Sequence, residues 1–236
     1  MRETPVTSPN SAPQHTSEVT TAQPAIEAVV ELLGVLAYGH LVAFDTMAAD
    51  ARLAPDLTRR AMLCEMAASE IAHYRALATR LREFGADPEQ AMRPYVAPIT
   101  AYHRQTQPTD WLEGLVKAYV GDSIADDFFR EVAQMLTSPD RELVLDVLHD
   151  TQYTDFAEKE VKQAIQQDPK LANRLALWAR RLVGEALTQA QQVAAEQDEL
   201  TALVVEGSGD LAGFGALMRR LTVAHSARMT AIGLNN

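Results

Sequence analysis

Apolar positions recur every three or four residues in long stretches of the chain, and polar positions fill the spaces between them. This spacing places the apolar side chains on one face of a helix. Sustained alternation of Val, Ile, Thr and aromatic residues at every second position does not occur in the sequence, so we expect no sheet. The pattern predicts an all-α protein.

Prolines separate these stretches after residue 23, and a proline is costly inside a helix but acceptable in its first turn. Asp56, Asp110 and Asp168 stand where a side-chain acceptor can cap the first turn of a helix, and Gly85 stands where a helix should stop. The predicted helices are at about 24–53, 56–84, 109–137, 139–167, 169–205 and 210–231.

The loop lengths predict the topology. About two residues join the first helix to the second and the third to the fourth, so each pair should form an antiparallel hairpin. The segment 85–108 contains four prolines, and at about 3.3 Å per residue it can run along the whole bundle in extended form. We expect a four-helix bundle of two αα-hairpins joined by this long crossover, with the two additional C-terminal helices packed outside it.

Residues 1–23 include eleven Ser, Thr or Pro and only five apolar residues, which predicts a disordered tail. The remainder, 24–236, is expected to be a single helical domain with its core bundle at 24–167 and the extra helices at 169–231.

Lys and Arg number 21 against 32 Asp and Glu, a net charge of −11. This balance argues against nonspecific binding to nucleic acid or to an anionic membrane surface, because both require a positive field. The longest apolar stretch is interrupted by polar residues and glycines, and no apolar signal core precedes Ile26. We therefore expect no membrane span and a cytoplasmic location.

Ionisable residues interrupt the apolar stripe of each of the first four predicted helices near its middle. A buried charge without a partner costs several kcal/mol, so four interruptions at one depth call for a shared explanation. The interrupting residues are His40, then Glu70 with His73, then Asp122, and finally Asp150.

The predicted register brings these residues together. Folding the first helix onto the second about Pro55 places His40 level with Glu70, and folding about Ser138 places Asp122 level with residues 150–155. Taken one at a time, each is better explained as a hydrogen-bonded histidine, a cap or an ion-pair partner. Taken together at one level of one bundle, they favour a metal site, because the Glu-x-x-His spacing lets both side chains reach one ion.

Four segments carry a resemblance to a known family: LLGVLAYGHLVAF, MAASEIAHYRAL, WLEGLVKAYVGDSIADDFFREVA and DTQYTDFAEKEV. They resemble the ferritin-like, carboxylate-bridged dimetal superfamily, and more narrowly the actinobacterial ferritin-like proteins grouped with the tRNA hydroxylase that acts on a methylthio-isopentenyl-adenosine base. The resemblance covers about 25–205 and implies a ferritin-like bundle. It also implies that Glu70, His73, Asp122 and Asp150 are metal ligands.

Two positions depart from the family pattern: His40 stands where a glutamate is expected, and Tyr153 stands where a second histidine is expected. Three outcomes remain open. The site holds two ions, with water, a Tyr153 phenolate or Asp155 completing the shell. It holds one ion, because His40, His73 and Glu70 have the composition of a two-histidine, one-carboxylate set for non-haem iron(II). Or it is degenerate and holds none, with His40 and Tyr153 hydrogen-bonding the carboxylates.

The resemblance implies a non-haem iron, or manganese, oxygenase or hydroxylase. Tyr153, although it departs from the family pattern, is the candidate catalytic residue beside the metal ligands. Its substrate is an unidentified small molecule or modified base, and nucleic acid enters only through the resemblance. The alternatives are an inactive ferritin-like scaffold or interaction protein and, less favoured, an iron-storage protein. Apolar stripes on the last two predicted helices allow a homodimer without requiring one.

Overall fold

The computed structural model describes residues 24–148 and 152–234, so the predicted tail 1–23 and the predicted ligand Asp150 lie outside the described residues. Within those ranges the chain forms helices and turns without a strand, which confirms the predicted all-α class. The elements are α1 (Ile26–Asp50), η1 (Ala51–Leu53), α2 (Leu57–Glu83), α3 (Pro88–Gln105), α4 (Trp111–Val116), η2 (Lys117–Asp122), α5 (Ser123–Ala133), α6 (Asp140–Val147), α7 (Gln152–Gln167), α8 (Leu171–Glu196), α9 (Asp198–Gly207) and α10 (Leu211–Ala231).

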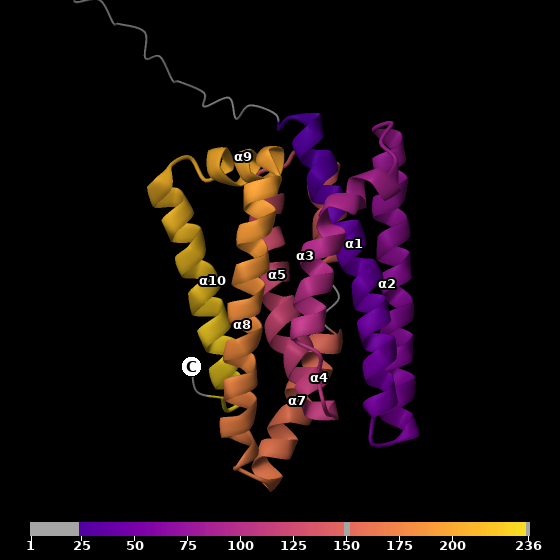
Figure 1. Cartoon of the computed structure of the whole chain (residues 1–236), viewed down its shortest axis with the longest axis vertical. Helices are drawn as coiled ribbons and strands as arrows, with labels where there is room; N and C mark the ends of the chain where they lie inside the picture. The colour runs from indigo at the N-terminus through magenta and orange to yellow at the C-terminus, as the bar shows by residue number, and fades with distance from the viewer. Residues whose placement is uncertain (1–23, 149–151, 235–236) are drawn as a thin grey trace, which may run out of the picture.

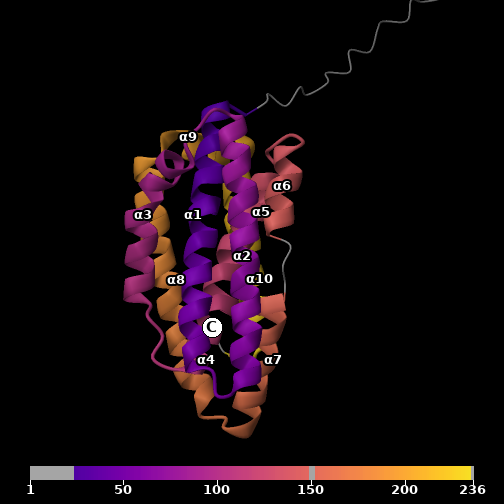
Figure 2. The same ribbon diagram turned by 90° about the vertical axis from the view of Figure 1, so that its right-hand side faces the viewer.

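The first hairpin forms as predicted, and α1 and α2 run side by side in both ribbon views (Figure 1, Figure 2). The Asp56 side chain caps α2 by accepting the backbone N–H of Arg59 at 2.9 Å. Gly85 takes a φ of 76° after the last turn of α2, a left-handed conformation that suits glycine and ends the helix. These two local signals fix the ends of α2.

The crossover differs from the prediction, because 88–105 is helical rather than extended. Asp87 caps α3 and Pro88 occupies its first turn, while Pro94 and Pro98 lie inside the helix. Each internal proline removes one backbone hydrogen bond. The burial of an apolar face against α1 and α8 offsets this loss, and the buried residues of that face are Tyr95, Pro98 and Tyr102.

The third rod of the bundle is built from α4, η2 and α5 instead of one uniform helix over 109–137. Its middle part, η2, is π-helical. A π-helix bonds residue i to residue i+5, so the faces that α-helical spacing assigns to side chains do not apply there. This segment lies in the interior of the bundle, and every residue from Leu115 to Val120 is buried.

The fourth rod contains α6 and α7, and its first part ends at Val147 rather than continuing as predicted. Two ion pairs join α2 to this rod. Arg59 contacts Glu160 of α7 at 2.6 Å, and Arg80 contacts Asp140 of α6 at 2.6 Å. Both acidic side chains are largely buried, so these pairs hold the two rods in register.

The C-terminal helices extend the bundle on the side away from α2. The predicted helix over 169–205 is divided at Gln197, and α9 runs across the end of the bundle between α8 and α10 (Figure 1). One face of α8 is buried in the core through Leu175, Trp178 and Leu182. The Trp178 indole donates to the Glu113 carbonyl at 3.0 Å, which joins α8 to the third rod.

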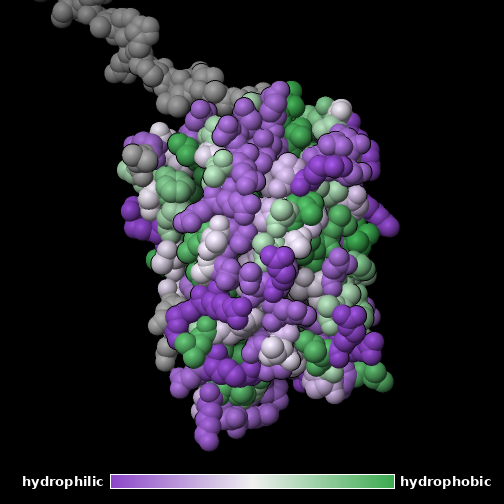
Figure 3. Space-filling view, in the orientation of Figure 1, coloured by the Kyte–Doolittle hydropathy of each residue, from purple (hydrophilic) through white to green (hydrophobic). Residues whose placement is uncertain are grey.

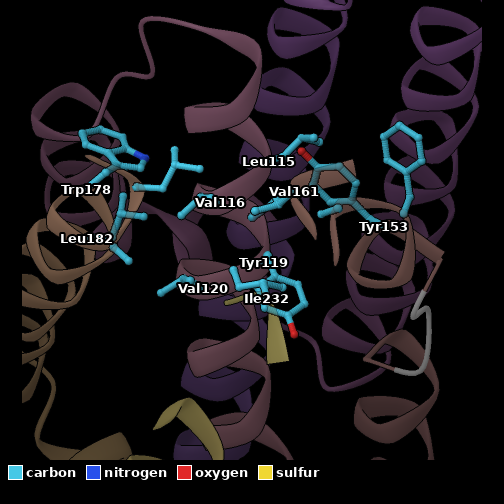
Figure 4. Close-up of a cluster of buried hydrophobic side chains, with 14 of the residues drawn as sticks. Leu115, Val116, Tyr119, Val120, Tyr153, Val161, Trp178, Leu182 and Ile232 are labelled. Atoms are coloured by element: carbon cyan, nitrogen blue, oxygen red, sulfur yellow. The ribbon is translucent and has the colours of Figure 1, made fainter. Parts of the chain in front are cut away.

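Apolar side chains form the interior in two clusters. One surrounds the lower half of the third rod and includes Leu115, Tyr119, Val161 and Leu182 (Figure 4). The other lies between the upper parts of α1, α2, α5 and α9. The outer face in Figure 3 is mainly hydrophilic, with smaller apolar areas between the polar ones.

One straight helical stretch of the described chain, Ile26–Leu53, is long and apolar enough by length and composition to cross a membrane, and the expected absence of a membrane span stays a prediction. In this fold 44% of its most apolar window is buried inside the protein. The core helix of a bundle and a membrane span share this composition, because both place apolar side chains around the whole helix.

Two glycines of α1 give a matched test of this packing. A Cβ atom at Gly34 would lie 2.3 Å from the backbone oxygen of Ala91 in α3, whereas a Cβ atom at Gly39 would meet nothing within 4 Å. Gly34→Ala should lower the free energy of unfolding by about 1–3 kcal/mol through overpacking. Gly39→Ala should raise it by about 0.5–1 kcal/mol, because alanine loses less backbone entropy. Urea denaturation of both variants measures these changes, and equal effects would contradict the close approach of α1 and α3.

Candidate metal centre

The α1–α2 hairpin brings three of the predicted residues together. The Nδ1 of His40 lies 2.6 Å from Oε2 of Glu70, and the Nδ1 of His73 lies 3.9 Å from the same oxygen. The two imidazole rings have centroids 5.0 Å apart and cross at 67°. One ligand atom from each residue lies within 4.8 Å of the other two. His40 and Glu70 therefore lie at the same level of the α1–α2 hairpin, as the sequence predicted.

Helical spacing accounts for this arrangement. Glu70 and His73 are three residues apart on α2, so they project from the same face toward α1. His40 reaches them from α1, because the short connection at Pro55 sets the register of the hairpin. The exposed fractions of the side chains are 11% for His40, 12% for Glu70 and 20% for His73, so the group is shielded but reachable from solvent.

Electrostatics favour the ionised form of Glu70. Burial alone would raise the pKa of its carboxyl group, but hydrogen bonds and positive charge from His40 and His73 outweigh burial and lower it to about 2. The carboxylate accepts the hydrogen bond, so His40 donates through Nδ1–H, and a neutral His40 ring would offer its Nε2 lone pair to an ion. The group thus presents an anionic oxygen and an imidazole lone pair at one place.

These residues fit a divalent first-row metal ion by composition and spacing. Two imidazoles and one carboxylate are the set typical of non-haem iron(II). Bonds of about 2.1 Å to neighbouring positions around one ion separate the ligand atoms by about 3 Å, so the three side chains, now within 4.8 Å of one another, must move closer together when the ion binds. The hydrogen bond between His40 and Glu70 must then open or be shared with the ion.

The other predicted residues lie elsewhere. Asp122 is not part of the three-residue group, although it is close enough to Glu70 for the two charges to interact. Burial raises the pKa of Asp122, and the nearby ammonium of Lys117 opposes that rise. Asp150 lies outside the described residues. The structure therefore does not place either carboxylate among the candidate ligands, and their roles as metal ligands remain predictions.

Tyr153 is buried on α7 with its hydroxyl directed toward Leu115 (Figure 4). Its charged neighbours are Asp50 and Asp122, and burial together with these two carboxylates raises the pKa of its phenol well above the usual range. A neutral phenol is therefore favoured over the phenolate that would complete a metal shell. The catalytic role of Tyr153 remains a prediction.

Sequence analysis missed three ionisable residues near this region. Asp126 lies one helical turn after Asp122 and is close enough to His40 and Glu70 for charge interaction, and burial is the main reason that its pKa rises to about 6. Asp50 continues the apolar stripe of α1 three residues after Met47, a signal that spacing alone could have shown. The third, Lys117, is buried in the π-helical segment η2.

These three residues and Asp122 extend the polar region along the third rod. The pKa of Asp50 rises to about 6 because burial outweighs the attraction of Lys117 and Arg52. Burial lowers the pKa of Lys117, while the carboxylates of Asp122 and Asp50 oppose that change. The bundle interior therefore contains two polar layers, the His40–Glu70–His73 group and a second layer around Lys117.

Comparison with known families agrees with the fold. The family model described as a ferritin-like domain of actinomycetes matches residues 25–207. The chain belongs to this family. The match spans α1 through α9 and so includes every helix that supplies a candidate ligand of this ferritin-like domain. No curated protein matches the chain.

The lowered pKa of Glu70 gives a pH-dependent test of the group. A carboxyl group whose folded pKa lies below its unfolded value of 4.5 contributes stability above pH 4.5, and that contribution disappears as the pH falls toward about 2. For the metal-free protein, we expect the stability of wild type relative to Glu70→Gln to fall by up to about 3 kcal/mol across this window. Urea denaturation at several pH values measures it, and a constant difference would contradict the hydrogen-bonded carboxylate.

Proposed function

We propose that this ferritin-like domain is a non-haem iron, or manganese, oxygenase or hydroxylase with its metal centre at His40, Glu70 and His73. The observation that carries the proposal is the convergence of two imidazoles and one ionised carboxylate within 4.8 Å inside the bundle. The three side chains are only 11–20% exposed, and the charge of Asp126 also acts on His40 and Glu70.

A bound iron(II) ion would supply coordination positions at which dioxygen can be reduced. The protein residues have separate tasks. His40, Glu70 and His73 hold the ion, and Glu70 also orients the His40 ring through the 2.6 Å hydrogen bond. Asp126 and Arg130, whose side chains lie 4.0 Å apart, place a further charged pair beside the group. The helices exclude bulk water and so strengthen these interactions.

Substrate access is supported by a pocket between α2 and α7. Its volume is about 230 Å³, and its lining includes Met62, Met66 and Gln152. Met66 lies four residues before Glu70 on α2, which places the pocket one helical turn from the candidate ligands. The two methionines suit an apolar substituent on the substrate, such as a prenyl group, because their flexible side chains adapt to its shape.

Metal binding is the first test. Wild-type protein freed of metal should bind Mn(II), or Fe(II) without oxygen, and Glu70→Ala or His73→Ala should weaken that binding more than about 100-fold because each removes a ligand. Asp45→Asn is the matched control: it removes an exposed carboxylate on α1, one turn beyond His40, and should bind as wild type does. Calorimetric titration measures the affinities, and unchanged binding in both alanine variants would reject this centre.

The modified-base substrate suggested by the sequence resemblance has its own test. Iron-loaded protein, dioxygen and a chemical reductant are incubated with tRNA that carries methylthio-isopentenyl-adenosine. One oxygen atom should enter a C–H bond of the isopentenyl group, while the other leaves as water after uptake of two electrons from the reductant and two protons. Mass spectrometry of the nucleosides detects the product. A product formed equally by His73→Ala would contradict catalysis at this centre.

The alternative is an inactive scaffold, and one observation favours it. The Glu70 oxygen already accepts a hydrogen bond from His40, so the group is partly satisfied without an ion. The two functions differ in the metal titration, because a scaffold would bind neither Mn(II) nor Fe(II) at these residues.

A further inference from the structure

Lys117 is the unexplained charge of the bundle interior. It is only 3% exposed, and it belongs to the π-helical segment η2. In an α-helix, residues five apart point about 140° from each other, so Lys117 and Asp122 would occupy different faces. In a π-helix such residues lie close to one face. The local winding of η2 therefore brings Lys117 and Asp122 toward one face of the rod, and their charges interact.

The groups around Lys117 are mostly acidic or neutral. The carboxylates of Asp50 and Asp122 interact with its charge, and the ammonium lies 5.4 Å from the ring centroid of Tyr102. His103 is also nearby, and burial followed by the charge of Lys117 lowers its pKa to about 3, which keeps the imidazole neutral. Among the described residues, Lys117 is the buried cation of this layer, whereas Arg52, which also attracts Asp50, is exposed.

Several polar atoms in this layer are buried without a hydrogen-bond partner among the described residues. They are Oδ2 of Asp50 and the hydroxyls of Tyr102 and Tyr153. Gly114 leaves room for one of them, because a Cβ atom there would lie 2.9 Å from Oδ2 of Asp50. Gly121 does the same for Tyr102, whose hydroxyl would lie 2.4 Å from an added Cβ atom. The third rod thus leaves space for the Asp50 carboxylate and the Tyr102 hydroxyl, two residues that also interact with Lys117.

Charge balance then distinguishes the two polar layers. The His40–Glu70–His73 group has one carboxylate and no permanent cation of its own. The layer of Asp50 and Asp122 has a lysine, whose charge opposes the entry of a further cation in a low-dielectric interior. We propose that Lys117 is a built-in cation that takes the place of a second metal ion and limits the bundle to one ion, at His40, Glu70 and His73.

The inference rests on the proposed function for the first ion, and it predicts the number of ions. Full-length protein freed of metal is incubated with Mn(II), separated from unbound metal, and analysed by elemental mass spectrometry. We expect one ion per chain in wild type and two in Lys117→Gln, because the variant leaves the carboxylates of Asp50 and Asp122 without their cation.

Matched variants separate charge from shape. Lys117→Gln combined with Asp50→Asn removes one positive and one negative group, so its stoichiometry should return to one ion per chain. Lys117→Met, an unbranched side chain of similar length, should bind two ions as Lys117→Gln does. Circular dichroism establishes that each variant retains its helices. Two ions in wild type, or one ion in both folded single variants, would overturn the inference.

A His73→Ala background distinguishes the failure of this inference from the failure of the proposed centre. His73→Ala alone should bind no ion tightly, and His73→Ala with Lys117→Gln should bind one, in the layer of Asp50 and Asp122. If wild type binds none but Lys117→Gln binds one, the proposed centre fails and the inference stands. If both bind one, the centre stands and the inference fails, and if both bind none, both fail.

Discussion

The cost of burying charge is the constraint on which the interior of this bundle depends. An isolated ionised group costs several kcal/mol in an apolar core, so each charge must have a partner or lose its charge. Glu70 remains ionised because two histidines contact it. Asp50 and Lys117 instead have pKa values shifted toward their neutral forms by burial and opposed by each other. The polar residues are therefore arranged in two layers, each with its own balance of charge.

The third rod determines how these layers relate to each other. Because η2 is π-helical, one short segment turns both Lys117 and Asp122 toward the interior, and α5 continues with Asp126 near the His40–Glu70 pair. Strained or irregular helical turns of this kind occur often at functional sites. Here the irregular turn contains a buried lysine, and its last residue, Asp122, is close enough to Glu70 of the candidate metal group for their charges to interact. The number of bound ions thus depends on helix winding as well as on ligand identity.

The function depends on what happens to the hydrogen bond between His40 and Glu70. If an ion replaces or shares that bond, the group supplies ligands for oxygen chemistry within an apolar bundle and beside the pocket lined by Met66. If the bond persists in the presence of metal, the same residues act as a satisfied polar group in a scaffold. The family match supports the ferritin-like bundle for either function.

Local sequence signals were sufficient to predict the helical class and the ends of α2 at Asp56 and Gly85. They also predicted the contact between His40 and Glu70. Capping, glycine conformation and hairpin register all act over short distances along the chain, which is why the sequence alone shows them. Tertiary packing decided the rest. It made α3 helical despite Pro94 and Pro98, because the burial of the apolar face of that helix stabilises it by more than the two missing backbone hydrogen bonds destabilise it. It also placed Lys117 in the core through a π-helical turn. A period of 3.6 residues cannot predict that placement, because the contacts that stabilise the altered winding come from distant parts of the chain.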